Sequence, residues 1–236
     1  MFKARVLVAG ISLAAASAAY AGVSATPAVT SDYDFRGISQ TAVQPAAQLG
    51  VDYSGGPIHV GTWLSTIEWG PSYKGSVEVD VMADYSFGSD DTAKFNVGII
   101  DYMYPDMTDQ NTIEPWVTVA KGMFSGSVRY SNDWFGLGHA WYFEGNVAYP
   151  IGKSGYTLTG HVGNSSGDAW KHIEYTDYSL ALSKGFGNFT GTIKVVSSDA
   201  DELTSYQSLL AFGKRDVFKT GTRAIISVST TLPWAK

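Results

Sequence analysis

Charged side chains recur at alternate positions of this chain, opposite apolar ones. In the stretch 76–88, Glu78, Asp80 and Asp84 share one face of an extended chain, whereas three valines share the other. Three carboxylates on one face are costly in a dry core but stable against water. The pattern therefore predicts a wall that turns an apolar side outward and a charged side toward a wet interior.

The same alternation along the chain predicts which side chains line that interior. Because both signs of charge occur, the lining residues would either form an ion-paired network that fills a narrow lumen or border a water-filled path. The acidic excess would favour cations in such a path. The predicted lining residues are Asp32, Asp34, Arg36, Asp52, Glu78, Asp80, Asp84, Glu114, Arg129, Glu144, Lys194 and Arg223.

Arg36 is the most distinctive of these residues. A planar guanidinium group can bind two carboxylates from neighbouring strands at once. We expect Arg36 to pair with Asp34, Asp52 or Glu78, in preference to binding a ligand.

No pattern in the chain predicts catalysis, a cofactor or a metal site. Cysteine is absent, which excludes disulfides, zinc–cysteine sites and thiol catalysis. The histidines, His59, His139, His161 and His172, lack metal-ligand spacing, and no G-x-S-x-G motif marks a nucleophile. We therefore predict a protein that is not an enzyme.

Short strands would position the lining residues. Runs with a period of two, separated by turn-forming residues, predict an all-β, antiparallel, up-and-down transmembrane barrel of about twelve strands. An even number is typical of single-chain bacterial barrels, although ten or fourteen strands remain open if the last long link hides a hairpin. The predicted strands are 29–39, 45–54, 58–68, 76–88, 93–104, 112–121, 124–132, 139–150, 155–164, 175–185, 189–198 and 222–232.

The predicted links alternate in length. Short turns follow the even-numbered strands, whereas the odd-numbered strands are followed by longer links, at 40–44, 69–75, 105–111, 133–138, 165–174 and 199–221. Short periplasmic turns and long extracellular loops are typical of outer-membrane barrels. The link 199–221 would either fold inward as a constriction or stay outside as a contact surface.

Aromatic residues gather near the predicted strand ends. Amphipathic rings favour the membrane–water interface, so these residues predict girdles around the wall. The pairs are Tyr33 and Phe35, Trp63 and Trp69, Tyr102 and Tyr104, Trp134 and Phe135, Trp141 and Phe143, and Trp170 and Tyr175.

The first 21 residues have the features of a secretory signal peptide. Lys3 and Arg5 precede an apolar stretch, and Ala19-Tyr20-Ala21 supplies an A-x-A cleavage site. The stretch is shorter than the roughly 20 residues that a membrane helix needs. We expect cleavage after residue 21, which leaves 22–236 as a single barrel domain. The net charge of −6 gives no basic footprint for nucleic acid.

Several segments together resemble a known family. They are SDYDFRGISQT from Ser31, PAAQLGVDYS, VGTWLSTIEWG, VEVDVMADYSFG, RYSNDWFGLGHAWYFEGNVAYPI from Arg129, and YTDYSLALSKGFG from Tyr175. This sequence resembles the TorF family of porin-like proteins, also catalogued as Gcw_chp, over nearly the whole chain after the signal. The resemblance implies a small outer-membrane barrel, held in outer-membrane lipid and regarded as a channel, with no substrate specified. Members of this family tend to end on an aromatic residue that the barrel assembly machinery recognises, whereas this sequence departs from the pattern and ends on Leu232-Pro233-Trp234-Ala235-Lys236. Leu232 with a short extension after it, or Trp234, would take that place, and the assembly signal would be weaker.

Three functions fit these patterns. The leading hypothesis is a porin or narrow channel for small polar solutes. The second is a plugged structural or adhesive barrel in the outer membrane. The third is a soluble periplasmic barrel that binds a ligand inside, for which the outward face would have to be polar. The oligomeric state is not predicted.

Overall fold

The computed structural model describes residues 22–70, 77–171, 174–200 and 217–234. The predicted signal peptide, His172 and most of the link 199–221 lie outside these residues, and what was expected of them stays a prediction. In the part of the chain that is described, no helix is long and apolar enough to cross a bilayer.

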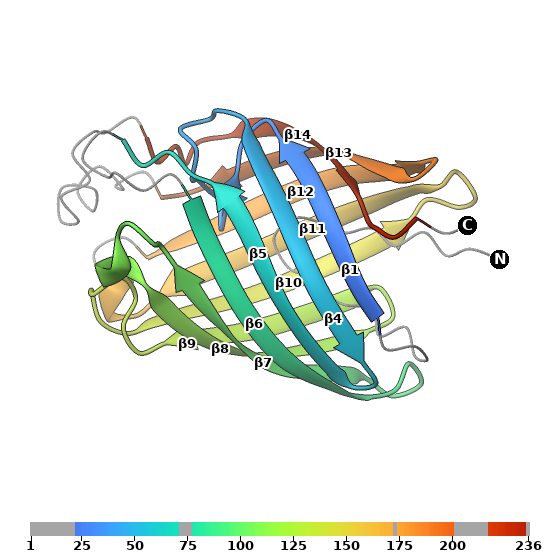
Figure 1. Cartoon of the computed structure of the whole chain (residues 1–236), viewed down its shortest axis with the longest axis horizontal. Helices are drawn as coiled ribbons and strands as arrows, with labels where there is room; N and C mark the ends of the chain where they lie inside the picture. The colour runs from blue at the N-terminus through green and yellow to red at the C-terminus, as the bar shows by residue number, and fades with distance from the viewer. Residues whose placement is uncertain (1–21, 71–76, 172–173, 201–216, 235–236) are drawn as a thin grey trace.

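Twelve of the described strands form one closed antiparallel barrel, which confirms the predicted fold (Figure 1). Neighbours in the chain are neighbours in the wall, and the last strand pairs with the first. The wall strands are β1 (Gly22–Thr30), β4 (Ala46–Gly55), β5 (Ile58–Thr66), β6 (Val77–Gly88), β7 (Lys94–Met103), β8 (Thr112–Lys121), β9 (Phe124–Ser131), β10 (Ala140–Pro150), β11 (Tyr156–Ser166), β12 (Tyr175–Phe186), β13 (Phe189–Ser198) and β14 (Arg223–Thr230).

The links sort to the two ends of the barrel as the sequence predicts. At one end, hereafter the short-turn end, tight turns join β4 to β5, β8 to β9 and β12 to β13. Gly122 and Gly187 lie in two of these turns with φ of 61° and 60°, a region that glycine enters without steric cost. The opposite end, hereafter the long-loop end, carries the longer links, with the short 3-10 helices η1 (Thr108–Gln110) and η2 (Asp168–Trp170).

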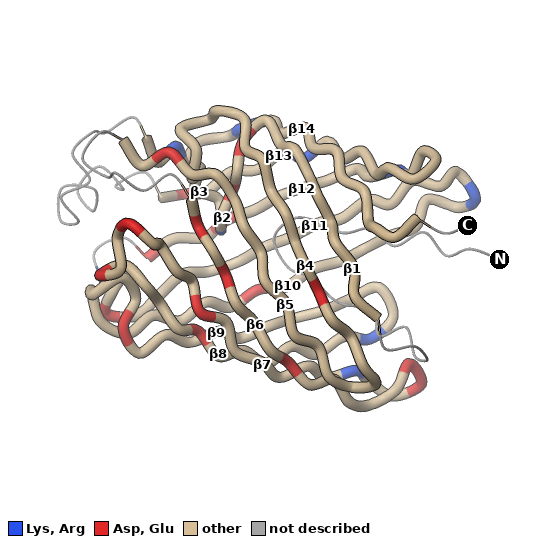
Figure 2. Tube along the Cα trace, in the orientation of Figure 1, with Lys and Arg blue, Asp and Glu red and all other residues tan. Residues whose placement is uncertain are grey.

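The two faces of the wall differ as the alternation predicts. On β6, Glu78 and Asp80 are 2% and 5% exposed, whereas Val81 between two inward positions is 45% exposed. Tyr85 and Phe87 continue the exposed face toward the short-turn end. The barrel therefore presents apolar side chains outward and encloses the carboxylates. Figure 2 shows acidic positions spread along the length of the barrel wall.

The first predicted strand, 29–39, is wrong. The wall strand is β1, which ends at Thr30, and the chain then turns into the lumen as the inward hairpin, defined here as residues 31–45. This hairpin contains β2 (Asp34–Phe35) and β3 (Ile38–Ser39), paired to each other and separate from the wall. Arg36 and Gly37 form its tip with φ of 49° and 80°. Alternation alone cannot reveal this turn, because the hairpin strands are themselves extended.

The seam that closes the barrel is shorter than the other joints. β1 pairs with β14 from Ala28 to Thr30. Farther along, β1 and the segment that follows β14 meet again at the isolated bridge between Ala25 and Leu232. Pro27 lies in the gap between them and has no N–H to donate. By contrast, β10 pairs with β11 over nearly its whole length.

Candidate functional site: the lumen and its inward hairpin

The structure places the predicted lining residues in two settings. Three of them, Asp32, Asp34 and Arg36, lie on the inward hairpin and not on a wall strand. The other nine lie on wall strands, namely Asp52 on β4, Glu78, Asp80 and Asp84 on β6, Glu114 on β8, Arg129 on β9, Glu144 on β10, Lys194 on β13 and Arg223 on β14. The ion pairs among the wall residues join neighbouring strands, β8 to β9 and β9 to β10. The ion pairs of the three hairpin residues join the hairpin to β8, β13 and β14 from inside the lumen.

The Arg36 side chain reaches from the hairpin to the far wall. Its Nη2 lies 2.6 Å from Oε1 and 2.7 Å from Oε2 of Glu114, a pair that is almost completely buried. Glu114 also accepts a hydrogen bond from the Tyr102 hydroxyl at 3.1 Å and lies 3.4 Å from Nη1 of Arg129. The next carboxylate along the wall is Glu144, whose Oε1 lies 3.6 Å from Nε of Arg129. The prediction that Arg36 pairs with Asp34, Asp52 or Glu78 is wrong, because the hairpin carries the Arg36 side chain across the lumen to Glu114 on β8.

Aromatic rings surround the Arg36 guanidinium. Its central carbon lies 4.0 Å from the ring centre of Tyr142, 4.8 Å from that of Phe35 and 5.0 Å from that of Trp134. Such cation–π contacts stabilise a desolvated cation. Burial by itself lowers the pKa of Arg36, but the Glu114 carboxylate together with Tyr102 and Tyr142 outweighs burial, and the net pKa lies above its ordinary value. Arg36 is therefore a permanent positive charge inside the barrel.

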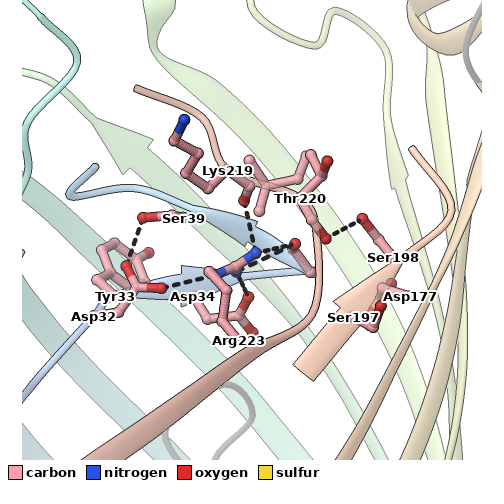
Figure 3. Close-up of polar contacts among 12 residues, drawn as sticks. Asp32, Tyr33, Asp34, Ser39, Asp177, Ser197, Ser198, Lys219, Thr220 and Arg223 are labelled. Carbon is pink, nitrogen blue, oxygen red and sulfur yellow. Dashed lines mark hydrogen bonds and ion pairs between the residues drawn. The ribbon is translucent and has the colours of Figure 1, made fainter. Parts of the chain in front are cut away.

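Arg223 holds the base of the hairpin (Figure 3). Its Nε donates to Asp32 at 2.9 Å and its Nη2 donates to Asp34 at 2.7 Å. Asp34 also accepts a hydrogen bond from Nζ of Lys194 at 2.9 Å, and Asp32 accepts one from the Ser39 hydroxyl on β3. Here a guanidinium binds two carboxylates at once, the arrangement that was expected of Arg36.

The hairpin tip packs tightly against the wall. A Cβ atom built on Gly37 would lie 2.7 Å from Cβ of Asp177 and 2.9 Å from Cβ of Ser198. These two residues belong to β12 and β13. Only glycine fits this position, both for its backbone angle and for its space.

Aromatic side chains fill the lumen around the hairpin at the long-loop end. The ring centres of Tyr33 and Trp63 lie 5.1 Å apart, and those of Trp69 and Tyr104 lie 4.6 Å apart. The girdle prediction is wrong for the buried members of this cluster, which are Tyr33, Trp69, Tyr102, Tyr104, Trp134, Trp170 and Tyr175. It agrees with the exposure of Trp141 and Phe143, which are 38% and 46% exposed. Clustering of aromatic residues near strand ends does not by itself show whether a ring lies at the membrane interface or packs inside the lumen.

Closer to the short-turn end, His59 bridges two strands. Its Nδ1 lies 2.6 Å from Asp84 and its Nε2 lies 2.9 Å from Asp52. Asn96 donates to Asp84, and the indole N–H of Trp116 donates to Asn96 at 2.6 Å. A doubly protonated imidazole satisfies both carboxylates. The sequence argument missed the neutral members of this group, although the parity rule applied to their strands would have found them.

A second histidine binds a carboxylate on the opposite side of the lumen. His161 Nε2 lies 2.8 Å from Asp177, and its Nδ1 lies 2.7 Å from the Asn146 side-chain oxygen. The Tyr142 hydroxyl also donates to Asp177 at 3.0 Å. Within the described ranges, neither histidine forms a hydrogen bond with a serine hydroxyl, and no cluster of three metal-ligating side chains occurs there.

Comparison with known proteins identifies the family. The model of a family described as bacterial proteins of unknown function (Gcw_chp) matches residues 14–229. The chain belongs to the Gcw_chp family. No curated protein sequence matches it.

Solved structures share the fold of this Gcw_chp protein. It aligns with the KdgM porin in complex with disordered oligogalacturonate at a TM-score of 0.54 and 12% identity, covering 88% of this chain and 97% of that one. It aligns with the NanC porin at a TM-score of 0.54 and 14% identity, covering 89% of this chain and 99% of that one. At these identities, the likeness shows a porin-like barrel fold.

Proposed function

We propose that this protein is an outer-membrane barrel with a narrow channel for small polar solutes and no catalytic step. The observation that carries the proposal is the closed wall, with apolar side chains outside and charged side chains inside. In hydrocarbon all backbone polar groups must be paired internally, and a closed barrel achieves this. A soluble ligand-binding barrel would need a polar exterior, whereas Val81, Val117, Leu180 and Ile193 are each about half exposed.

The proposed setting follows from this wall. Residues 1–21 would act as the secretory signal, outer-membrane lipid would surround the barrel, and the barrel assembly machinery would insert it. The short-turn end would face the periplasm and the long-loop end the exterior. The likeness to KdgM and NanC supports a porin-like barrel, and the sequence segments quoted above support the TorF designation.

The proposed path is narrow at one end only, because different side chains line the two halves of the lumen. Toward the short-turn end, small polar residues such as Thr26, Ser125 and Thr192 face inward and are only partly buried. Toward the long-loop end, the hairpin and its aromatic cluster fill the interior. A solute that crosses the barrel must therefore pass the hairpin.

Charge inside the barrel favours cationic or neutral solutes. Among the described residues, the inward carboxylates outnumber the inward lysines and arginines, which are Arg36, Lys94, Arg129, Lys194 and Arg223. An anionic solute would be repelled from a lumen with this excess of carboxylates. We therefore do not propose the oligogalacturonate of the KdgM complex as a solute of this protein.

The second candidate is a plugged structural barrel. It is favoured by the ion-pair chain from Arg36 through Glu114 to Arg129, which ties the hairpin to the wall across the lumen. In that case the hairpin would be a permanent closure and the loops would serve as contact surfaces.

Planar-bilayer recordings of the purified full barrel separate the two candidates. We compare the wild type with a variant in which 32–44 is replaced by a short glycine–serine linker. Discrete current steps from the wild type, with larger steps from the variant, support the narrow channel. A silent wild type with a conducting variant supports the plugged barrel. Silence from both folded proteins refutes a channel role.

A further inference from the structure

Glu78 and Asp80 differ from every other inward carboxylate in the described part of the chain. The other carboxylates each have a basic group within 4.0 Å, whether arginine, lysine or histidine, and they are Asp32, Asp34, Asp52, Asp84, Glu114, Glu144 and Asp177. Glu78 and Asp80 form no such pair, although they are among the most deeply buried.

Their hydrogen bonds do not compensate for this burial. Glu78 accepts a hydrogen bond at Oε1 from the Tyr104 hydroxyl at 3.1 Å, and the Tyr33 hydroxyl also lies beside this carboxylate, but its Oε2 has no partner in hydrogen-bond geometry. The Oδ1 of Asp80 has no partner either. A buried carboxylate without a partner costs several kcal/mol, which a proton or a bound cation must offset.

Aromatic rings frame the pair on the same face. Across the sheet, Asp80 lies between Trp63 of β5 and Tyr102 of β7. Tyr33 of the inward hairpin packs on Trp63 with ring centres 5.1 Å apart. Burial raises the pKa of Tyr33 well above its ordinary value, and the charges of Glu78 and Asp80 raise it further, so Tyr33 stays neutral beside them.

We propose that Glu78 and Asp80, with the rings of Tyr33, Trp63 and Tyr102, form a binding site for an organic ammonium ion in the lumen wall. Two carboxylates supply the charge, and ring faces attract a cation of this type. A divalent metal fits poorly, because Ca²⁺ takes six to eight oxygen ligands and no metal-ligating cluster occurs in the described chain.

The site would deepen the proposed function, on which it rests, by naming the class of solute. Tyr33 belongs to the hairpin that fills the long-loop end, so the ammonium site lies beside the segment that a solute on the proposed path must pass. A cationic solute would then be bound at the point where the hairpin must let it pass.

Saturation-transfer-difference NMR with methylammonium chloride tests binding without requiring conduction. The samples are the folded full barrel, the double variant Glu78→Gln with Asp80→Asn, and the control Asp52→Asn, which removes an inward charge that His59 already pairs. We expect the apparent Kd for methylammonium to rise about tenfold or more in the double variant and to stay near the wild-type value in the control.

Three results would overturn the ammonium site. They are no signal from the wild type, an undiminished signal from the double variant, or displacement of methylammonium by an equal concentration of Ca²⁺. If the double variant does not fold, the single variant Asp80→Asn gives the same comparison. Bilayer recordings on the same preparation keep the two proposals apart, because binding without current refutes only the channel and current without binding refutes only the site.

Discussion

Replacing Arg36 by alanine should release the inward hairpin from the far wall. The Arg36 side chain is 7% exposed and its Nη2 contacts both oxygens of Glu114. Removing one partner of a buried ion pair costs about 3–5 kcal/mol. Glu114 keeps Arg129 and Tyr102, which places the cost near the lower end. About 3 kcal/mol corresponds to a shift of roughly 100-fold in the equilibrium between docked and released hairpin.

Two measurements check this magnitude. The Arg36→Ala barrel should unfold at a lower temperature, seen as the loss of its compact form on unheated gels, and it should pass larger currents in planar bilayers. Arg36→Lys keeps the charge but loses the planar guanidinium, so its effect should be intermediate. Lys121→Ala removes an exposed charge at the short-turn end and should match the wild type. Wild-type heat resistance and wild-type current in Arg36→Ala would refute the reasoning.

Three further changes test other parts of the structure. Gly37→Ala should destabilise the barrel by about 2–4 kcal/mol through backbone strain and crowding, whereas Gly122→Ala, with open space around it, should cost only the strain; equal unfolding midpoints in urea would contradict the tight fit. Val81→Lys on the outward face should impair assembly into vesicles by about 2–4 kcal/mol, whereas Met82→Lys, next along β6 and facing the inward carboxylates, should assemble; equal yields would speak against lipid contact. His59→Leu leaves the carboxylates of Asp52 and Asp84 without the histidine between them and should lower the urea midpoint by the equivalent of about 2 kcal/mol. An unchanged midpoint would show that His59 does not stabilise the barrel.

Period-two alternation was enough to predict most of the barrel. It separates Asp80 from Val81 because lipid-facing and lumen-facing residues must differ in polarity, and link length separates the two ends. The strand from Phe189 to Ser198 was predicted to the residue. These features depend on local sequence, and local sequence is what alternation reports.

The inward hairpin could not be predicted in the same way. Asp34 and Arg36 occupy alternate positions that look like one more wall strand, and the turn at Arg36 and Gly37 depends on where the chain finds partners. Those partners, Arg223 and Glu114, lie far along the sequence. The misplaced aromatic girdle has the same cause, because the rings that were expected at the membrane interface pack around a hairpin that only the tertiary structure reveals.

The short pairing between the first and last strands bears on how the wall would fail. A joint with few cross-strand hydrogen bonds, interrupted at Pro27, resists separation less than the long joint between β10 and β11. Under mechanical load, the wall should therefore open lengthwise along this line first, from the end where Pro27 interrupts the pairing, while the hydrogen bonds of Arg223 on β14 to Asp32 and Asp34 still hold the other end.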